Sequence, residues 1–221
     1  MNRVLILDTE TSGLDPKSGH LLEVAVAQYS IAHGLIRAHS WIVKAPSNEA
    51  YVVNGIPVEL VRDDHGAVDS RNLDKVLHSL CETSDAIVAH SAEFDRQWLP
   101  DLERPWICTC DDVTWPRQTT SKSLVAIALA HGVGVSSAHR ALADVMTLVA
   151  LFNRVRESHD LGAMLARGLR PKARFVSLAP FDRKDEVKAA GFRWDAAQKV
   201  WTRMMALEDA SALPFEVRQE S

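Results

Sequence analysis

The chain has 221 residues, of which 47% are hydrophobic and 24% are charged, and its formal net charge is −4 at pH 7. These values are typical of a soluble protein that can fill a real core, as one large domain or as one medium domain with a small appendage. No apolar run approaches the length of a membrane span and no apolar targeting stretch opens the chain, which argues against a membrane partner.

The three cysteines do not have the number or spacing of a cross-linking or zinc-binding set. An odd number does not make a disulfide framework, and Cys108, Cys110 and the distant Cys81 lack the paired spacing of a zinc site. We therefore expect reduced, structural cysteines and a cytoplasmic location.

The charge is unevenly distributed along the chain. Residues 1–164 contain 14 Lys and Arg against 21 Asp and Glu, whereas residues 165–204 contain 10 against 4. A basic segment in an acidic protein indicates a polyanionic partner. On charge alone, a basic linker with a solvated helix face explains the segment equally well.

The predicted elements of the first 156 residues are three strands followed by alternating helices and strands. The apolar run Val4–Leu7 indicates a buried strand, and the runs Leu21–Ile31 and Leu35–Val43 indicate a β-hairpin. Residues 45–66 are irregular. The other expected elements are a helix over 73–80, a strand over 85–90, a helix over 92–99 with Ser91 as its N-cap, a strand over 106–109, and helices over 121–131 and 138–155. This order predicts a mixed sheet with helices packed on it.

Two carboxylates follow the first strand at a spacing that places them on one face. Asp8 and Glu10 are two residues apart, so their side chains project side by side from a strand. Adjacent carboxylates repel each other, and a divalent cation such as Mg²⁺ or Mn²⁺ offsets both charges. An acidic turn after the strand is the alternative, because Gly13, Asp15 and Pro16 favour turns.

Three residues on later elements complete a candidate set. Asp95 lies in the first turns of a helix that follows a central strand, and Asp144 lies on or near the inward face of the last long helix, with His139 at its start. Each has an ordinary explanation as well: Asp95 complements a helix dipole, Asp144 is a flanking residue, and His139 is a surface residue. The combination with Asp8 and Glu10 favours a shared site.

Three segments together resemble the DEDDh branch of the proofreading-type (DnaQ-like) 3′–5′ exonucleases, over about residues 3–155. They occur in that family's order: Asp8-Thr9-Glu10-Thr11-Ser12-Gly13-Leu14, His90-Ser91-Ala92-Glu93-Phe94-Asp95 and His139-Arg140-Ala141-Leu142-Ala143-Asp144. The resemblance implies a ribonuclease-H-like fold and a general base, His139, that deprotonates the attacking water. It also implies two divalent cations, Mg²⁺ or Mn²⁺, held by Asp8, Glu10, Asp95 and Asp144.

The implied activity needs a pocket for a 3′ end. The backbone from Thr11 to Gly13 can approach a terminal hydroxyl closely because glycine adds no side chain. Leu14 and Ile56 can wedge against the last base and Phe94 can pack on a base or sugar, although core packing explains all three equally well. The expected substrate-binding residues are Thr11, Gly13, Leu14, Asn54, Ile56, His90 and Phe94.

Two positions depart from the family's pattern. Ser91 stands where the second motif more often has Asn, and Asn54 stands where many members have His before the glycine. Both positions lie near the substrate strand in that family, so the departures concern substrate preference rather than catalysis.

The remaining chain divides into a linker over 157–172, a small α+β domain over 173–206 and an acidic tail over 207–221. The small domain resembles a domain of unknown function that is often appended to DNA-processing proteins. We expect a strand over 174–178, a helix over 182–190 with Asp182 as its cap, and a hairpin formed by 192–195 and 200–203.

The predicted hairpin presents two tryptophans together within a basic segment. Trp194 and Trp201 can face each other across the strands, which with basic residues around them is the composition of a stacking platform for single strands. The basic residues of this segment are Arg174, Lys188, Arg193, Lys199 and Arg203. Alternatively, a domain this small needs both tryptophans to build a core.

The sequence therefore predicts an α/β protein with a ribonuclease-H-like mixed five-stranded sheet flanked by helices, followed by a small α+β domain. The predicted function is a metal-dependent 3′–5′ exonuclease acting on single-stranded 3′ ends, with DNA favoured. An RNA-trimming enzyme of the same family and a non-catalytic nucleic-acid-binding protein remain alternatives, and the intact set of five residues argues against the second. A polymerase partner is compatible with the family, but no tethering segment is evident, and the oligomeric state is left open.

Overall fold

The computed structural model describes residues 1–64, 66–136 and 139–220. The chain divides into two compact units, residues 1–168 and residues 169–221. Each unit has its own β-sheet, with five strands in the first and four in the second.

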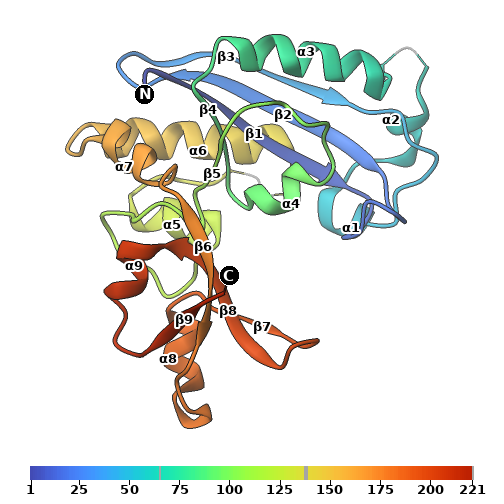
Figure 1. The fold of residues 1–221 in the computed structure, drawn as a ribbon. Helices are drawn as coiled ribbons and strands as arrows, with labels where there is room; N and C mark the ends of the chain where they lie inside the picture. The colour runs from blue at the N-terminus through green and yellow to red at the C-terminus, as the bar shows by residue number, and fades with distance from the viewer. Residues whose placement is uncertain (65, 137–138, 221) are drawn as a thin grey trace. The chain divides into compact units, whose positions relative to one another are not determined.

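The sheet of the first unit has the strand order β3-β2-β1-β4-β5, so β1 lies at its centre (Figure 1). β2 pairs antiparallel with β1 and with β3, whereas β4 runs parallel to both β1 and β5. The antiparallel strands are joined by short connections, and the parallel strands are separated by helical segments, as their geometry requires. The strands are β1 (Arg3–Thr11), β2 (Leu21–Ser30), β3 (Gly34–Ile42), β4 (Ala86–Ala89) and β5 (Trp106–Cys108).

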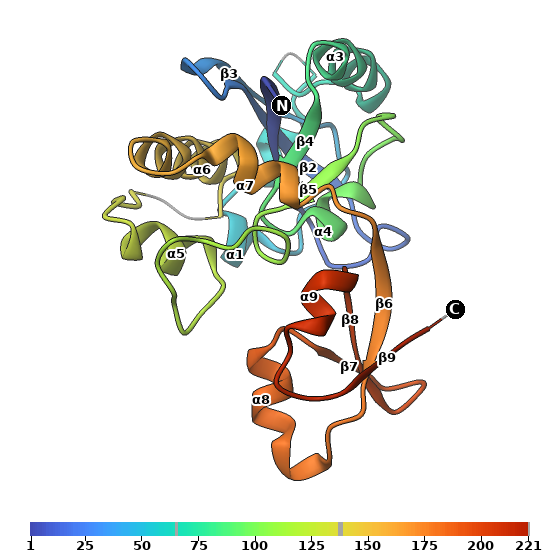
Figure 2. The same cartoon turned by 60° about the vertical axis from the view of Figure 1, so that its left-hand side comes forward.

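Helices cover both faces of this sheet, with α3 on one face and α6 on the other (Figure 1, Figure 2). Val4 and Ile6 of β1 join the apolar cluster under α6, whereas Leu5 and Leu7 join the cluster that contains residues of α3. Burial on both faces explains why β1 is continuously apolar. The helices of this unit are α1 (Tyr51–Asn54), α2 (Val58–Arg62), α3 (Ser70–Glu82), α4 (Ala92–Arg96), α5 (Leu124–Ala130), α6 (Ala141–Arg156) and α7 (Leu161–Arg167).

The mixed five-stranded sheet flanked by helices confirms the ribonuclease-H-like arrangement that the sequence predicts. One local expectation is wrong, because the stretch 45–66 contains α1 and α2. Ser91 is the N-cap residue of α4 as expected, but its side chain makes no capping hydrogen bond. With four and five residues, α1 and α2 are too short for a helical apolar period to be visible in the sequence.

The second unit has a four-stranded sheet in the order β7-β8-β6-β9, in which each pair is antiparallel. Its core contains Phe175, Phe192, Met205 and Phe215, so the unit buries aromatic side chains of its own. Its elements are β6 (Lys172–Ser177), the 3₁₀ turn η1 (Phe181–Arg183), α8 (Lys184–Ala189), β7 (Arg193–Asp195), β8 (Val200–Ala206), α9 (Leu207–Ser211) and β9 (Val217–Gln219).

The second unit extends further along the chain than the sequence predicts. The expected linker, 157–172, contains α7 and the first residue of β6, and the expected acidic tail, 207–221, contains α9 and β9. Ala210 and Phe215 are buried in the unit's core and β9 pairs with β6, so these acidic residues belong to ordered structure. Asp182 lies in η1, and the N-cap of α8 is Arg183 instead. In neither unit does a described helix combine the length and apolarity needed to cross a membrane.

Candidate active site

Two acidic side chains lie at the carboxyl end of β1, on the face of the sheet that α6 covers. Asp8 and Glu10 continue the alternation of Val4 and Ile6, whose side chains belong to the apolar cluster under α6. Both carboxylates are partly buried. The central strand of the sheet therefore ends in two neighbouring acids with restricted access to water.

The first turn of α6 adds a third carboxylate, Asp144. One carboxylate oxygen from each of Asp8, Glu10 and Asp144 lies within 4.8 Å of the others. Val145 and Leu148 of α6 are fully buried in the cluster shared with β1, so core packing fixes the helix that carries Asp144. The structure thus brings together three of the four carboxylates that the sequence predicts as one site.

Burial raises the pKa values of all three carboxyl groups, and repulsion by neighbouring carboxylates adds to the shifts of Asp8 and Glu10. The pKa of Glu10 rises to about 7, chiefly because of burial and then because of the charges of Asp144 and Glu23. Burial and the charges of Asp95 and Asp144 hold the pKa of Asp8 well above its ordinary value. Such a cluster takes up a positive charge, as a proton or a cation, more readily than isolated carboxylates do.

Asp95 reaches β1 from α4 but lies outside the group of three converging oxygens. Its Oδ1 accepts hydrogen bonds from the backbone N–H of Thr9, at 3.0 Å, and from the Thr9 hydroxyl, at 2.8 Å. The side chain is only 2% exposed, and burial raises its pKa to about 7. Thr9 therefore holds Asp95 beside β1, near enough for its charge to raise the pKa of Asp8.

His139 lies two residues before α6 and is exposed. Its φ of 60° lies in the left-handed region, which residues other than glycine seldom adopt. Its charge and a backbone hydrogen bond lower the pKa of Asp144, against the larger effect of burial. The sequence places the helix start at residue 138, which lies outside the described residues, whereas the structure begins α6 at Ala141.

A fifth acidic residue, Glu23 of β2, was missed by the sequence reasoning. Glu23 is 2% exposed and lies directly across the sheet from Glu10. Its Oε2 accepts hydrogen bonds from Arg140 Nε, at 2.9 Å, and from the backbone N–H of Ala141, at 3.3 Å. α6 has no side-chain cap of its own, so Glu23 fulfils this role from the neighbouring strand. The one signal for Glu23 in the sequence is a glutamate within an otherwise apolar strand.

The predicted base-contacting residues fall into two groups. Leu14 and Phe94 form the first group, whose side chains are at least partly accessible. Leu14, in the first motif, is 84% exposed, and Phe94 is partly buried with its ring centroid 6.1 Å from that of Trp98. Ile56, in contrast, is fully buried in a cluster with Leu22, so its side chain packs in the core and does not reach a bound base.

The first motif is stabilised by hydrogen bonds that involve two other predicted residues. Asn54 is buried, and its Nδ2 donates to the carbonyl of Thr11 at 3.1 Å, while the Thr11 hydroxyl donates to the carbonyl of Gly13 at 2.7 Å. These contacts connect α1 to the segment that follows Glu10. Asn54 therefore shapes the backbone that the sequence predicts to contact a 3′ end.

His90 is positioned by hydrogen bonds at both ring nitrogens. Its Nδ1 lies 3.0 Å from Thr109 Oγ1 and its Nε2 lies 2.9 Å from the carbonyl of Lys122. Burial lowers its pKa, which favours the neutral ring. His90 thereby connects the end of β4 to the loops after β5.

In the second unit, the two predicted tryptophans pair across the hairpin, and Lys188 Nζ lies 5.6 Å from the centroid of the Trp201 ring, whereas Arg193 and Lys199 are placed differently. Trp194 and Trp201 are directly opposite in the register, with ring centroids 5.5 Å apart. Arg193 pairs with Thr202, one residue along, so it projects from the other face of the sheet. Lys199 lies in the turn between the strands, with a φ of 56°.

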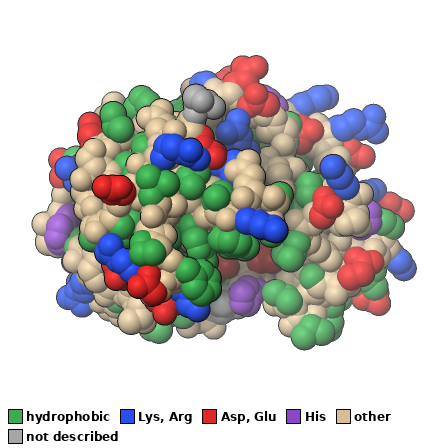
Figure 3. All heavy atoms as spheres, turned by 60° about the horizontal axis from the view of Figure 1, so that its bottom comes forward, with side chains coloured by type: hydrophobic (Ala, Val, Ile, Leu, Met, Phe, Trp, Pro, Cys, Tyr) green, Lys and Arg blue, Asp and Glu red, His purple; other side chains and the backbone are tan. Residues whose placement is uncertain are grey.

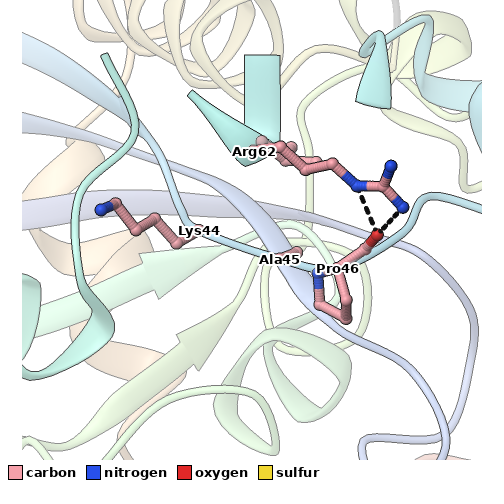
Figure 4. Close-up of a pocket in the computed structure, with 5 residues that line it drawn as sticks. Lys44, Ala45, Pro46 and Arg62 are labelled. Carbon is pink, nitrogen blue, oxygen red and sulfur yellow. Dashed lines mark hydrogen bonds between the residues drawn. The ribbon is translucent and has the colours of Figure 1, made fainter. Parts of the chain in front are cut away.

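A shallow pocket of about 340 Å³ lies in the first unit, away from the converging acids (Figure 4). Its two cationic side chains are already used by the protein: Lys44 pairs with Asp64 at 2.8 Å, and Arg62 Nε donates to the carbonyl of Pro46 at 2.7 Å. This pocket therefore offers little free charge for a ligand.

The acidic cluster has the chemistry of a divalent-cation site. Oxygen atoms from Asp8, Glu10 and Asp144 converge within 4.8 Å of one another. Burial raises the pKa of each carboxyl group, and the neighbouring negative charges raise the pKa values of Asp8 and Glu10 further. Hard cations such as Mg²⁺ and Mn²⁺ prefer carboxylate oxygens in such a cluster. The residues present fit the cofactor that the sequence predicts.

Comparison with known proteins gives matches in both units. Residues 176–219 match a family described as a domain of unknown function (DUF8626), as expected for this part of the chain. DNA polymerase III PolC-type from Thermotoga petrophila is 29% identical over 168 residues, which are 69% of this chain. Those residues are only 12% of the polymerase, so the chain corresponds to a small part of that relative.

Two solved structures share the fold. Exonuclease X in complex with 5′ overhanging duplex DNA is 26% identical, with a TM-score of 0.60 and coverage of 75% of this chain and 97% of that one. The zinc-bound form of an E. coli exonuclease I complex with single-stranded DNA is 17% identical, with a TM-score of 0.60. The second match covers 82% of this chain and 49% of the exonuclease I chain. The chain is thus similar to nucleases.

Proposed function

We propose that this chain is a metal-dependent 3′–5′ exonuclease that removes nucleoside monophosphates from single-stranded 3′ ends, with DNA favoured over RNA. The observation that carries the proposal is the convergence of carboxylate oxygens from Asp8, Glu10 and Asp144 at the end of a central strand. The similarity to exonuclease X and exonuclease I supports a nuclease on this fold.

The proposed cofactors are two divalent cations, Mg²⁺ or Mn²⁺, bound by Asp8, Glu10, Asp95 and Asp144. When bound, such ions activate water and stabilise the attacking and leaving oxygens of a phosphodiester displacement. The raised pKa values of Asp8 and Glu10 support this assignment, because the group carries more negative charge than its surroundings compensate.

His139 is the proposed general base. An exposed imidazole beside Asp144 can accept the proton of the attacking water at a ring nitrogen and release it to solvent. The hydrogen bonds from Arg140 and Ala141 to Glu23 orient the segment that carries His139. Glu23 and Arg140 are therefore positioning residues, distinct from the groups that contact substrate.

The proposed substrate contacts begin where β1 ends. The backbone from Thr11 to Gly13, stabilised by Asn54, faces the terminal sugar, and the exposed Leu14 contacts the last base. Phe94 contacts a base or sugar from α4. Apolar contacts of this kind require unpaired bases, which favours single-stranded ends.

The test is incubation of 5′-labelled single-stranded DNA and RNA of equal sequence with Mg²⁺, followed by gel separation of the products. A ladder of progressively shorter labelled products supports 3′–5′ hydrolysis, and faster DNA shortening supports the substrate preference. Immediate release of labelled mononucleotide, or no shortening of either substrate, contradicts the proposal. Asp8→Asn serves as the inactive variant and Glu82→Gln, an exposed acid at the end of α3, as its control.

A further inference from the structure

The β7–β8 hairpin of the second unit presents an aromatic pair at its surface. Trp194 and Trp201 are cross-strand neighbours with ring centroids 5.5 Å apart and planes inclined by 59°. Trp194 is 50% exposed, whereas Trp201 packs partly against the apolar core of the unit. Trp201 therefore anchors the pair, and Trp194 offers an indole face to solvent.

Two lysines of α8 extend this pair into a longer row. Lys188 Nζ lies 5.6 Å from the centroid of the Trp201 ring, and Lys184 Nζ lies 4.7 Å from that of Phe181. Lys184 and Lys188 are four residues apart, so they share one side of the helix. Phe181 is 75% exposed. The row of Phe181, Lys184, Lys188, Trp201 and Trp194, here called the aromatic–lysine row, places two lysines between an exposed phenylalanine and the tryptophan pair.

Among the described residues of the second unit, no ion pair uses Lys184 or Lys188, although Asp182 and Asp185 lie in the same segment. Arg170 pairs with Glu208 and Asp209, and Arg174 pairs with Asp195 and Glu220. These four carboxylates therefore pair with arginines that are not part of the aromatic–lysine row. A further pair, Arg183 with Glu186, uses a third arginine of the unit and an acid of α8. Figure 3 shows basic, acidic and apolar side chains interspersed over the face in view.

We infer that the aromatic–lysine row is a second binding surface for single-stranded nucleic acid. Bases stack on exposed aromatic faces without regard to sequence, and lysines between the rings contact the phosphates that connect successive bases. An apolar protein partner would not use the two lysines. The inference extends the proposed function, because the same strand whose 3′ end is hydrolysed supplies the bases that stack.

Trp194→Ala tests the inference, because this side chain is exposed and contributes less to the core than Trp201. Binding of a 5′-fluorescein-labelled oligothymidylate to the full chain is measured by fluorescence anisotropy in EDTA, where metal-dependent hydrolysis is suppressed. We expect Trp194→Ala to raise Kd about tenfold, since one base loses its stacking partner. Trp194→Phe, which keeps an aromatic face, restores most of the affinity. An oligouridylate of equal length tests whether RNA binds by the same row.

Met204→Ala is the matched control. Met204 is an exposed apolar residue, 56% exposed, on the same strand as Trp201 but on the opposite face of the sheet. We expect its Kd to equal that of the wild-type chain. Thermal melting of each variant confirms that it is folded.

The lysines are tested by salt dependence. The double variant Lys184→Ala with Lys188→Ala should lower the slope of log Kd against log salt by about 1.4, because each phosphate contact on a single strand contributes about 0.7. An unchanged Kd for Trp194→Ala, or an unchanged slope for the lysine variant, overturns the inference. Failure of the proposed hydrolysis is recognised separately, as a lack of oligonucleotide shortening in Mg²⁺ by a chain that still binds.

Discussion

At the scale of single residues, the pairing of Glu23 with Arg140 determines how the start of α6 is held. The carboxylate of Glu23 is 2% exposed and accepts from both Arg140 Nε and the first N–H of the helix, Ala141. A buried carboxylate without such partners is costly, so the contact fixes the chain immediately after His139.

We predict that Arg140→Ala is more harmful than Glu23→Gln. The first variant leaves a buried charge with only one backbone partner, whereas the second keeps an acceptor for the N–H of Ala141. We expect Arg140→Ala to lower the free energy of unfolding by about 2 kcal/mol, a loss that solvent screening limits because Arg140 is 42% exposed. We also expect kcat to fall by a larger factor than KM changes. Chemical denaturation and steady-state kinetics measure both effects.

A double-mutant cycle distinguishes this explanation from independent effects. The double variant Glu23→Gln with Arg140→Ala should be more active than Arg140→Ala alone, because the unpaired charge is gone. Strictly additive losses in stability and in kcat would argue that the two side chains act separately.

His139 is the proposed general base and Asp8 a proposed metal ligand, so their variants should differ in whether an added base restores activity. We expect His139→Ala and Asp8→Asn each to lower kcat by a factor of about 10² to 10⁴, the range for a positioned acid–base group or metal ligand. Added imidazole should partly restore His139→Ala, whose carboxylates are intact, but not Asp8→Asn. Wild-type turnover by either variant would remove that residue from the proposed mechanism.

The raised pKa values of the acidic cluster predict how stability depends on pH without metal. Glu10 titrates near 7 in the folded chain instead of near 4.5, so the folded state binds more protons than the unfolded state between these values. Stability contributed by the protonated form is therefore present at acidic pH and lost as the pH rises from about 4.5 to about 7. We expect a higher Tm at pH 5.5 than at pH 8 in EDTA.

Two controls assign that effect to the cluster. Saturating Mg²⁺ or Mn²⁺ should raise the Tm at pH 8, because a cation bound to the folded state stabilises it. Glu10→Gln should show a weaker pH dependence and a smaller response to metal. An equal pH dependence in wild type and variant would place the titrating groups elsewhere.

At the scale of elements, α1 matters because Asn54 connects it to the end of β1. The Nδ2 of Asn54 donates to Thr11 and its Oδ1 accepts from the backbone N–H of Ile56. Asn54→Ala would leave a buried carbonyl and a buried N–H without these partners, so we expect a loss of about 1–3 kcal/mol in unfolding free energy. Thermal melts measure the loss of stability, and KM for a single-stranded substrate measures the effect on binding.

How well the sequence predicted each element follows from the length over which its signal extends. β1 and β2 form long apolar runs, and α6 carries an apolar stripe, so their side-chain periods are visible without a structure. α1 and α2 have too few residues to show a period. The acidic residues of the segment 207–221 dominate its composition and predict a tail, although Phe215 and Val217 join the core of the second unit.

Only part of the candidate site could be predicted from the sequence. Asp8, Glu10 and Asp144 were found by motif and are brought together, as the register of β1 and the packing of α6 require. Glu23 could not be assigned a role, because its pairing with Arg140 joins residues 117 positions apart. The burial of Ile56 likewise depends on contacts with Leu22, which no local pattern reveals.

At the scale of the whole molecule, the proposals place two binding surfaces for single-stranded nucleic acid on one chain, so one strand of sufficient length could occupy both. A second weak contact raises the effective concentration of substrate at the first, provided that the strand is long enough to reach both. We predict that KM falls as oligonucleotide length increases and then reaches a plateau. In Trp194→Ala this dependence should be weaker, with kcat on short substrates unchanged.

Steady-state kinetics on a series of oligothymidylates of increasing length provide the measurement. Met204→Ala should retain the wild-type dependence, since its side chain lies on the opposite face of the hairpin. A KM that is independent of length in the wild-type chain would show that the two surfaces do not share a substrate molecule.

The pairing of Trp194 with Trp201 also makes the hairpin optically distinctive. Two indoles whose centroids are 5.5 Å apart, with planes inclined by 59°, couple their electronic transitions and produce an exciton couplet in circular dichroism. The sign and amplitude of such a couplet depend on the mutual orientation of the rings, so it reports on this single contact within a protein that contains six tryptophans. The second unit thus carries an intrinsic chromophore pair, and we expect its spectrum to change if a bound base reorients one ring or if β7 separates from β8.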